Sequence, residues 1–514
     1  MTAQTHAPPA KPLRQRPALT ACALALLSAC AVGPNYHRPS APVPDRFKEQ
    51  QGWKPAEPRE AASGTNWWSV YEDPTLDDLE KQIDVSNQTL KASEAAWRQA
   101  VAVVSQARAS LLPTVGVAAT AQRSHEPAGG GVGTTTTSGG TTVTTGATAS
   151  SHPLNQFELL GTASWDVDIW GKIRRTIESD VANARASEAE LAAARLSAQA
   201  TLATDYVELR VADEQRTLLE QTVTAYQRSL DITENQYKVG VAAKTDVITA
   251  QTQLEGAQSQ LINVGVTRAT LEHAIAVLIG KPPAEFSLPA AKLGEATPVV
   301  PTGVPSDLLE RRPDVAQAER EMAAMNAQVG VAIAAYFPDL TLTGTYGWAS
   351  TVLPGLLRAP NNLWSFGGSA VDTLVDFGAR AAQVRQARAA YDEAVANYRE
   401  TVLTAFQQVE DELATLRILE QQYQVQDQAA RSAALAAQLT LNQYKAGTVA
   451  YTSVVTQQTI ALGDAQTLLT IRQNRLTASV ALIQALGGGW QADTLGKPDG
   501  TAAKLAAAER GQTH

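Results

Sequence analysis

The 514-residue chain is poor in cysteine, and its two cysteines, Cys22 and Cys30, both lie near the N-terminus. Apart from a short N-terminal run, it lacks any stretch near the roughly 18 apolar residues that a membrane-spanning helix needs. Aromatic residues make up only 5%, and no basic patch with interleaved aromatics occurs in a chain of formal net charge −9. These absences exclude a disulfide-rich fold and a bundle of transmembrane helices, and they argue against nucleic acid as a partner.

Proline is absent from two long segments, although the chain contains 25 prolines. None lies between Pro153 and Pro282, or between Pro360 and Pro498. Proline breaks helix interiors because it lacks the backbone donor and clashes with the preceding turn. The segment 171–236 is also rich in alanine, which favours helix, and it would extend roughly 100 Å at about 1.5 Å per residue. Both segments therefore predict very long helices.

Apolar residues recur every three or four positions in the first proline-free segment, which is the spacing of a coiled-coil seam. Only Arg268 interrupts the returning half of this pattern. The segment therefore predicts a helical hairpin. Its ascending seam is Leu219, Val223, Tyr226, Leu230, Thr233 and Tyr237, and its returning seam is Val247, Ala250, Leu254, Ala257, Leu261, Val264, Arg268, Leu271, Ile275 and Leu278.

The turn of this hairpin occurs twice, as "TENQYKVG" from Thr233 and "TLNQYKAG" from Thr440, 207 residues apart. The same offset relates other glycines, such as Gly171 and Gly378. The chain is therefore one unit used twice: a short helix, a strand, a loop, a strand and a long helical hairpin. In each turn the sequence predicts a left-handed glycine after the helix (Gly240, Gly447), a lysine at its C-terminus (Lys238, Lys445) and an N-cap for the returning helix (Asp246, Ser453).

Alternating apolar and polar residues predict two strands before each hairpin, beginning near Val115 and covering 157–169, 338–350 and 363–374. The first two are joined by a Gly/Thr/Ser-rich loop that cannot build a core. Strands of this length, apolar on one side, suit a transmembrane β-barrel, and half-buried strands of a soluble sandwich are the alternative. Four strands cannot close a barrel in lipid, because their edges would leave backbone groups unpaired. Several copies of the chain would have to close it together.

The N-terminus has the pattern of a secretion signal, with Lys11, Arg14 and Arg16 before the apolar run 18–27. The residues "LSA" before Cys30 resemble a bacterial lipobox, in which the cysteine receives a diacylglyceryl group. An ordinary signal with an incidental cysteine is the alternative. Ala31 after the cysteine favours sorting to the outer membrane. Cys30 is therefore the predicted lipidation site, and a lipid-modified terminus anchors a chain without spanning the membrane.

No catalytic or cofactor-binding constellation is found in the sequence. "DFG" at 376–378 lacks the other kinase motifs, and "GGGVGTT" lacks the lysine of a phosphate-binding loop. The six histidines show no metal-ligand spacing. We therefore expect a protein that is not an enzyme and has neither cofactor nor metal site.

Five motifs resemble one family, the outer-membrane factors, which are TolC-like proteins, and in particular their NodT lipoprotein branch. They are "CAVGPNYHRP" at 30–39, "NWWSVYEDPTLDDLE" at 66–80, "VPSDLLERRPDVAQAER" at 304–320, "GVAIAAYFPDLTLTG" at 330–344 and "NQYKAGTVAYTSVVTQQ" at 442–458.

This resemblance implies a mixed, mainly α fold with membrane β-strands. Three chains would form a 12-stranded barrel in the outer membrane of a Gram-negative bacterium and a helical tunnel in the periplasm. The function implied is that of a passive efflux duct, whose partners are a periplasmic adaptor protein and an inner-membrane pump of the RND type. The implied division is a signal peptide at 1–29, a lipid-anchored extended leader at 30–65, repeats at 66–290 and 300–490, and a C-terminal tail at 491–514.

The resemblance also assigns the hairpin turns to adaptor docking, although any one turn residue could serve only the turn itself. Some relatives close the tunnel with acidic rings six and nine residues past the second glycine, where this chain has Ser453 and Thr456. Asp246 occupies the first of these positions in the first hairpin, and we expect it to act as an N-cap before any role in a constriction. The implied docking residues are Gln236, Tyr237, Lys238, Gly240, Gln443, Tyr444, Lys445 and Gly447.

Two other classes of protein remain as alternatives. A surface-anchored coiled-coil adhesin would use the helices, but it would not need the duplicated strand pairs. A periplasmic hydrolase would need a nucleophile and base, which the sequence does not offer.

Overall fold

The computed structural model of the protein describes residues 31–44, 46–49, 66–125, 136–138, 141–143, 153–292, 294, 308–490 and 495. The predicted signal peptide, Cys30 and nearly all of the predicted tail lie outside these residues. The chain divides into two compact units. Unit 1 comprises 1–36, 102–181 and 324–391, and unit 2 comprises 37–101, 182–323 and 392–514.

Each compact unit takes segments from both predicted repeats. In unit 1, a strand of the first repeat pairs with a strand of the second. In unit 2, both hairpins contribute to one hydrophobic cluster. The repeat is thus a unit of sequence and local structure, whereas the compact units combine both copies. The repeat boundaries at 66–290 and 300–490 stay predictions.

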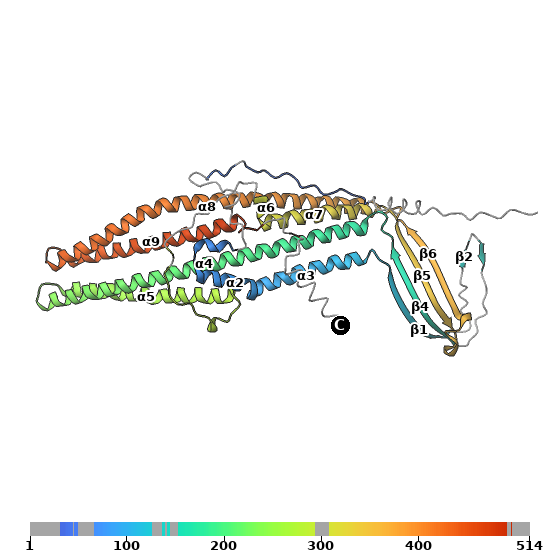
Figure 1. The fold of residues 1–514 in the computed structure, drawn as a ribbon, viewed down its shortest axis with the longest axis horizontal. Helices are drawn as coiled ribbons and strands as arrows, with labels where there is room; N and C mark the ends of the chain where they lie inside the picture. Colours follow the sequence, from blue (N-terminus) through green and yellow to red (C-terminus); the bar gives the residue numbers. More distant parts are fainter. Residues whose placement is uncertain are drawn as a thin grey trace, which may run out of the picture. The chain divides into compact units, whose positions relative to one another are not determined.

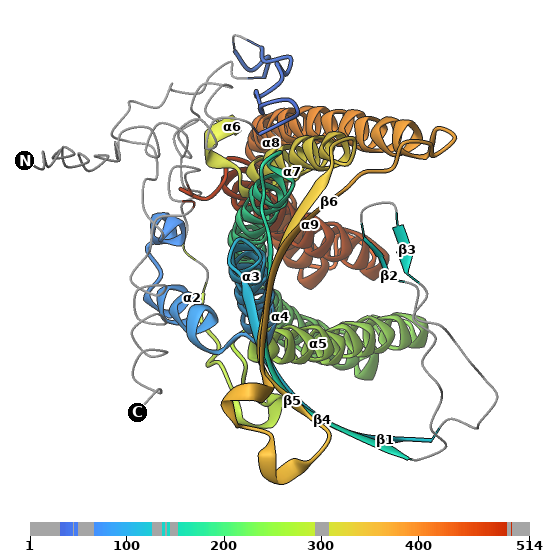
Figure 2. The same cartoon turned by 90° about the vertical axis from the view of Figure 1, so that its right-hand side faces the viewer.

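Unit 1 contains a four-stranded antiparallel sheet in the order β1-β4-β5-β6 (Figure 1). Its strands curve together as one band (Figure 2). Among the described residues, β1 and β6 each have a strand neighbour on one side only, so the sheet has two open edges. The bounds are β1 Thr114–Ser124, β4 Leu154–Asp166, β5 Asp339–Ser350 and β6 Asn362–Val371, and a separate short hairpin is formed by β2 Thr136–Ser138 and β3 Thr141–Val143.

Three details of the strands differ from the sequence-based expectation. β4 ends at Asp166 because the carboxylate of Asp168 accepts hydrogen bonds from the backbone N–H groups of Ile173 and Arg174, at the start of the following helix. β6 ends at Val371 because its neighbour β5 begins only at Asp339. The short β2–β3 hairpin, which the sequence analysis did not predict, lies in the Gly/Thr/Ser-rich loop.

The two predicted hairpins are present, and their helix bounds repeat with one constant offset. Helices α4 (Lys172–Lys238) and α8 (Ala379–Lys445) each have 67 residues, and α5 (Lys244–Leu278) and α9 (Tyr451–Ala485) each have 35. Every start and end in the second hairpin lies 207 residues after its counterpart in the first. The remaining helices are η1 Trp67–Tyr71, α2 Pro74–Ser86, α3 Gln88–Ala109, η2 Pro283–Glu285, α6 Leu308–Arg311, α7 Pro313–Ala334, η4 Leu353–Gly355 and η5 Ala359–Asn361.

The ends of the returning helices are held in the same way in both repeats. The side chain of Asn87 donates a hydrogen bond to the Leu278 carbonyl at 2.7 Å, and Arg312 donates to the Ala485 carbonyl at 3.1 Å. Each bond satisfies a carbonyl at a helix C-terminus, which has no partner within the helix. The contact at the end of the returning helix is therefore conserved between the two repeats, although the donor is the amide of Asn87 in the first and the guanidinium of Arg312 in the second.

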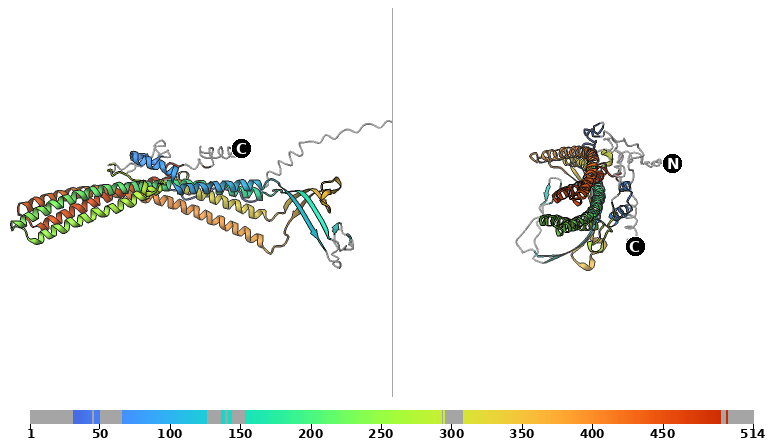
Figure 3. Two further views of the ribbon diagram at one scale, coloured as in Figure 1. Left: turned by 90° about the horizontal axis from the view of Figure 1, so that it is seen from below. Right: turned by 90° about the vertical axis from the view of Figure 1, so that its left-hand side faces the viewer.

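The predicted seam residues lie on the packed faces of the hairpins in unit 2, except Tyr237, which is exposed at the end of α4. The two hairpins run side by side (Figure 3). Leu219, Tyr226, Leu254 and Ile275 are buried, for example. By length and composition alone, α5 could cross a membrane, which the sequence reading missed, because one 18-residue window reaches a mean hydropathy of 1.2. We assign α5 to the hairpin because its seam residues pack in the hydrophobic cluster shared with α4 and α9.

Candidate functional site

Both hairpins turn through the same backbone motif, which ends α4 at the first tip (236–241) and α8 at the second tip (443–448). The N–H of Val241 donates to the Gln236 carbonyl at 2.8 Å, and the N–H of Gly240 donates to Tyr237 at 2.9 Å. The second tip repeats both bonds 207 residues later. This pair of bonds defines a Schellman motif, which needs a left-handed residue after the helix. The predicted glycines are confirmed, since φ is +76° at Gly240 and +74° at Gly447.

The two tips expose different side chains despite their shared sequence. Tyr237 of the first tip is 46% exposed, and Val239 and Val241 beside it are also exposed. Tyr444, its counterpart in the second tip, is only 6% exposed. The structure therefore separates Tyr444 from the other predicted docking residues, because its ring is part of the core beneath the tip. Lys238, Gln443 and Lys445 are exposed, and Gln236 is half-buried.

A tyrosine-rich core supports the tips from within. The ring of Tyr444 lies 5.2 Å from that of Tyr451, measured between centroids, and its hydroxyl donates to Thr233 Oγ1 on α4 at 3.4 Å. Further from the tips, Gln458 of α9 donates to Ser229 Oγ at 3.1 Å. Burial raises the pKa of the Tyr451 hydroxyl, and the nearby Tyr444 raises it further. These contacts join the second hairpin to the first, so the tips form one packed assembly.

The expectation that Asp246 and Ser453 are N-caps is wrong. Helix α5 begins at Lys244 and α9 at Tyr451, so the N-cap residues are Ala243 and Ala450. Asp246 lies in the first turn of α5, and its carboxylate accepts a hydrogen bond from the backbone N–H of Ala243 at 3.3 Å. An acidic residue at this position stabilises the helix by satisfying a free donor and by its charge near the N-terminus.

The predicted constriction positions differ in their surroundings. Asp246 is half-buried, and its charge contributes to raising the pKa values of Tyr444 and Tyr451, after burial and other nearby groups. Ser453 and Thr456 are exposed on α9, and the Thr456 hydroxyl donates to the Thr452 carbonyl of its own helix. A role for the three residues in closing a tunnel stays a prediction.

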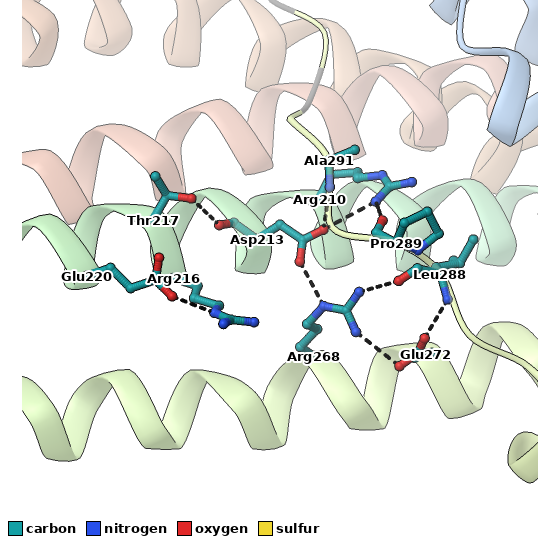
Figure 4. Close-up of polar contacts among 10 residues, drawn as sticks. All are labelled: Arg210, Asp213, Arg216, Thr217, Glu220, Arg268, Glu272, Leu288, Pro289 and Ala291. Carbon is teal, nitrogen blue, oxygen red and sulfur yellow. Dashed lines mark hydrogen bonds and ion pairs between the residues drawn. The ribbon is translucent and has the colours of Figure 1, made fainter.

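Arg268, the one interruption of the heptad pattern, lies in a network of ion pairs between α4 and α5 (Figure 4). Its Nε lies 2.8 Å from Asp213 Oδ1 on α4, and its Nη1 lies 3.0 Å from Glu272 Oε2 on α5. Asp213 also accepts from the buried Arg210 at 3.2 Å. The sequence showed only a polar residue in a seam, since Asp213, its partner on α4, lies 55 residues away in the chain.

The same network fixes the segment that follows α5. Arg210 donates to the Pro289 carbonyl at 2.7 Å, and the N–H of Leu288 donates to Glu272 at 2.6 Å. Backbone groups of an extended segment need partners when they are buried. The charged network thus attaches the connection between the repeats to the first hairpin.

The start of the described leader is fixed in unit 1. The N–H of Val32 donates to the Trp170 carbonyl at 3.0 Å, just before α4 begins. The guanidinium of Arg175 donates to the carbonyls of Val32 and Gly33 and to the side chain of Asn35, at 3.0 to 3.2 Å. The leader is therefore bound where β4 leads into α4.

The pairing of the sheet gathers apolar residues on one face. Residues that face each other across the strands, such as Leu159 and Trp348 or Tyr346 and Trp364, have the same polarity along nearly the whole sheet. The opposite face is rich in Thr, Ser, Gln and Asp. The apolar face consists of Val115, Val117, Ala119 and Ala121 on β1, Phe157, Leu159, Gly161, Ala163 and Trp165 on β4, Leu340, Leu342, Gly344, Tyr346 and Trp348 on β5, and Trp364, Phe366, Gly368 and Ala370 on β6.

The family model for outer membrane efflux proteins matches the chain twice, at residues 79–281 and 304–488. The chain belongs to this family. Its two matches follow the internal duplication. Its members are outer-membrane efflux channel components, so the function of this efflux protein is transport across the outer membrane.

Relatives of this efflux protein are similar to it over nearly their whole length. The toluene efflux pump outer membrane protein TtgC of Pseudomonas putida is 28% identical over 472 residues, which cover 91% of this chain and 94% of the relative. The cation efflux system protein CusC of Escherichia coli O6:H1 is 28% identical over 475 residues, covering 91% and 98%.

Solved structures of outer-membrane channels have the same fold as this efflux protein. The channel OprN superposes with a TM-score of 0.82 at 27% identity, over 90% of this chain and all of OprN. The open state of the Neisseria gonorrhoeae channel MtrE gives a TM-score of 0.76 at 25% identity, over 90% of this chain and all of MtrE.

Proposed function

We propose that the protein is the exit duct of a tripartite efflux system, docked through its hairpin tips to a periplasmic adaptor and through it to an inner-membrane pump of the RND type. The duct is passive, so the energy for transport comes from the pump. The observation that carries this proposal is the combination of an open-edged sheet, apolar on one face, with two long hairpins in a chain of the efflux family.

The sheet supports a homotrimeric barrel of 12 strands. Its apolar face suits lipid, and its polar face suits a water-filled interior. Both edges of the sheet carry free backbone groups that lipid cannot satisfy, and closure removes such edges. Three copies of a four-stranded sheet supply 12 strands, which leave an aqueous interior wider than that of an eight-stranded barrel.

The contacts of the leader support a lipid anchor at Cys30. Val32 is bound to Trp170 beside the end of β4, so a lipid on the preceding Cys30 would start close to the end of the membrane sheet. An acyl chain there would strengthen the attachment of the protein to the outer membrane.

The exposed side chains of the tips support docking. Tyr237, Val239 and Val241 form an apolar group flanked by Lys238 at the first tip, while the second tip presents Gln443 and Lys445. Aromatic and aliphatic residues exposed at a turn are suited to a protein partner. The relatives' names span toluene, cations and pyoverdine, which fits a duct whose cargo is chosen by the pump.

The test is the conductance of the purified protein in planar bilayers, with its oligomer mass determined in the same detergent. We expect a trimer that forms small, mostly closed channels. A monomer without conductance would contradict the proposal and favour a structural role for the coiled coil.

A further inference from the structure

We propose that β6 of one copy pairs antiparallel with β1 of the next in one defined register, with Leu374 opposite Val115 and Ser369 opposite Thr120, and that Phe377 packs on Leu112 of that copy. The inference rests on the proposed oligomeric barrel and specifies the contact between its copies. It follows from the strand pairing within one chain between β4 of the first repeat and β5 of the second.

The pairing between β4 and β5 within one chain has a defined register. Thr162 of β4 lies opposite Thr345 of β5, and Trp165 lies opposite Leu342. Beyond the strand, the N–H of Val167 donates to the Leu340 carbonyl at 2.9 Å. The ring of Trp170 then stacks on Phe337 with centroids 4.7 Å apart, and its Nε1 donates to the Pro338 carbonyl at 3.0 Å.

The two strand pairs of the chain are equivalent, which allows this register to be transferred. "LLPTV" of the first repeat aligns with "YFPDL" of the second, so β1 corresponds to β5 with an offset of 225. Thr114 pairs with Ser164 in the first repeat, and its counterpart Asp339 pairs with Val371. β4 therefore corresponds to β6 with an offset of 207, the same offset as in the hairpins. With these two offsets, the pairing of β4 with β5 corresponds to a pairing of β6 with β1 of the next copy.

The residues that this mapping brings together are exposed within one chain. Leu374 is 88% exposed and Phe377 is fully exposed, although their counterparts Val167 and Trp170 contact the second repeat. Phe377 also has a φ of +51°, a conformation that is costly for a bulky residue unless its surroundings favour it. An exposed apolar segment of this kind marks an interaction surface.

The opposite edge of the sheet presents a matching surface. Leu112 is 67% exposed and Val115 is 78% exposed, and they correspond to Phe337 and Leu340. Those two residues receive Trp170 and Val167 within the chain. The mapping therefore places exposed Leu374 opposite exposed Val115 and exposed Phe377 against exposed Leu112. A second copy of this chain is the one occupant that satisfies both surfaces.

Disulfide crosslinking tests the register directly. Val167 and Leu340 form a hydrogen-bonded pair, and such pairs alternate along an antiparallel ladder, so Thr162 and Thr345 are a non-hydrogen-bonded pair with close side chains. Their counterparts Ser369 and Thr120 are thus suited to a disulfide, and both lie on the polar face. The pair S369C/T120C is compared with S369C/A118C, which would face each other only after a two-residue slip.

We expect the first pair to crosslink copies into covalent dimers and trimers on oxidation, and the second pair to give at least tenfold less product. Crosslinking of the slipped pair, or of neither, in channels with trimer mass and normal conductance would overturn the register and leave the proposed function intact. A monomeric, non-conducting protein without crosslinks would overturn both.

The packing of Phe377 is tested by Phe377→Ala in the full chain. We expect the oligomer band on semi-native gels to disappear at a lower temperature than in the wild type. Leu353→Ala, which removes an exposed apolar side chain between β5 and β6, is the control and leaves that temperature unchanged. Equal effects of the two substitutions would overturn the contact with Leu112.

Discussion

Arg268 Nε lies 2.8 Å from Asp213 Oδ1, and this ion pair joins α5 to α4 at the one position where the predicted seam of α5 is not apolar. Asp213 is nearly fully buried and lies within ion-pair distance of both Arg210 and Arg268. The polar position in the seam therefore has a structural role. Arg268 and Asp213 hold α5 against α4, and they also bind backbone groups of the segment that connects the repeats.

Arg268→Leu restores the apolar pattern of the seam, yet we expect it to destabilise the protein. Removing Arg268 leaves buried Asp213 with Arg210 as its one remaining counter-charge and takes the cation away from half-buried Glu272, and breaking such a pair costs up to about 3 kcal/mol. Thermal unfolding followed by circular dichroism measures the change. Arg216→Ala is the matched control, because Arg216 pairs with Glu220 on the exposed surface of α4, where such a pair contributes roughly 0–1 kcal/mol. A stability gain in the leucine variant would contradict this role.

Gly447→Pro is expected to reduce efflux in a strain that relies on this duct, because proline cannot adopt φ of +74° and cannot donate to the Tyr444 carbonyl. Gly447→Ala should have a milder effect, since no atom lies within 4 Å of an added Cβ, and the left-handed backbone alone costs about 1–2 kcal/mol.

Gly463→Ala is the control for the tip variants. Gly463 lies within α9, and an added Cβ there also meets no atom within 4 Å, so alanine should stabilise the helix by roughly 0.5–1 kcal/mol. Efflux that survives Gly447→Pro at the wild-type rate would refute the assignment of the second tip to docking.

Cys30→Ser is expected to abolish the incorporation of labelled palmitate, because serine offers no thiol for the diacylglyceryl group. Cys22→Ser should still become labelled, since Cys22 lies within the predicted signal peptide. The measurement is autoradiography of the immunoprecipitated protein. Label in the Cys30 variant would show that the chain is acylated elsewhere or by another route.

Glu80 of α2 is expected to make stability depend on pH. Burial, and then the charges of Asp84 and Asp77, raise the pKa of its carboxyl to about 9, and its two oxygens have no hydrogen-bond partner within the described residues. The folded protein thus keeps a proton that the unfolded chain releases above the ordinary pKa of 4.5. Stability is fully present below that value and is lost as pH rises toward 9.

Glu80→Gln removes this titration. We expect the unfolding temperature of the wild type to fall between pH 5 and pH 8, with a loss of about a few kcal/mol, and that of the variant to fall clearly less. Glu255→Gln, on the exposed face of α5, should behave as the wild type does. Parallel pH profiles for the wild type and Glu80→Gln would exclude a protonated buried carboxyl.

Features set by local sequence were predictable. The left-handed glycines, the alternation of the strands and the spacing of the seams all follow from neighbouring residues, and they are present where expected. The repeat also predicted a second hairpin at a constant offset of 207, and the helix bounds follow that offset.

Features set by contacts between distant residues were not predictable. The N-cap prediction failed for a local reason instead, because Asp246 lies at the third residue of α5, where its carboxylate accepts from the N–H of Ala243. Tyr237 and Tyr444 occupy identical motifs, and only the packing of the second hairpin against α4 buries one of them. Likewise, the contribution of Arg268 to stability depends on its ion pair with Asp213, which lies on another helix.

Because the two tips are separate segments of one chain, a substitution can change one tip and leave the other unaltered. Each tip is encoded once in the gene but recurs in every copy of an oligomer, so a ring of such chains presents two kinds of turn in alternation. A single substitution such as one at Tyr237 would alter every second turn and leave the others as they were. Inherited variation could therefore change one half of the proposed docking ring while the other half stays the same.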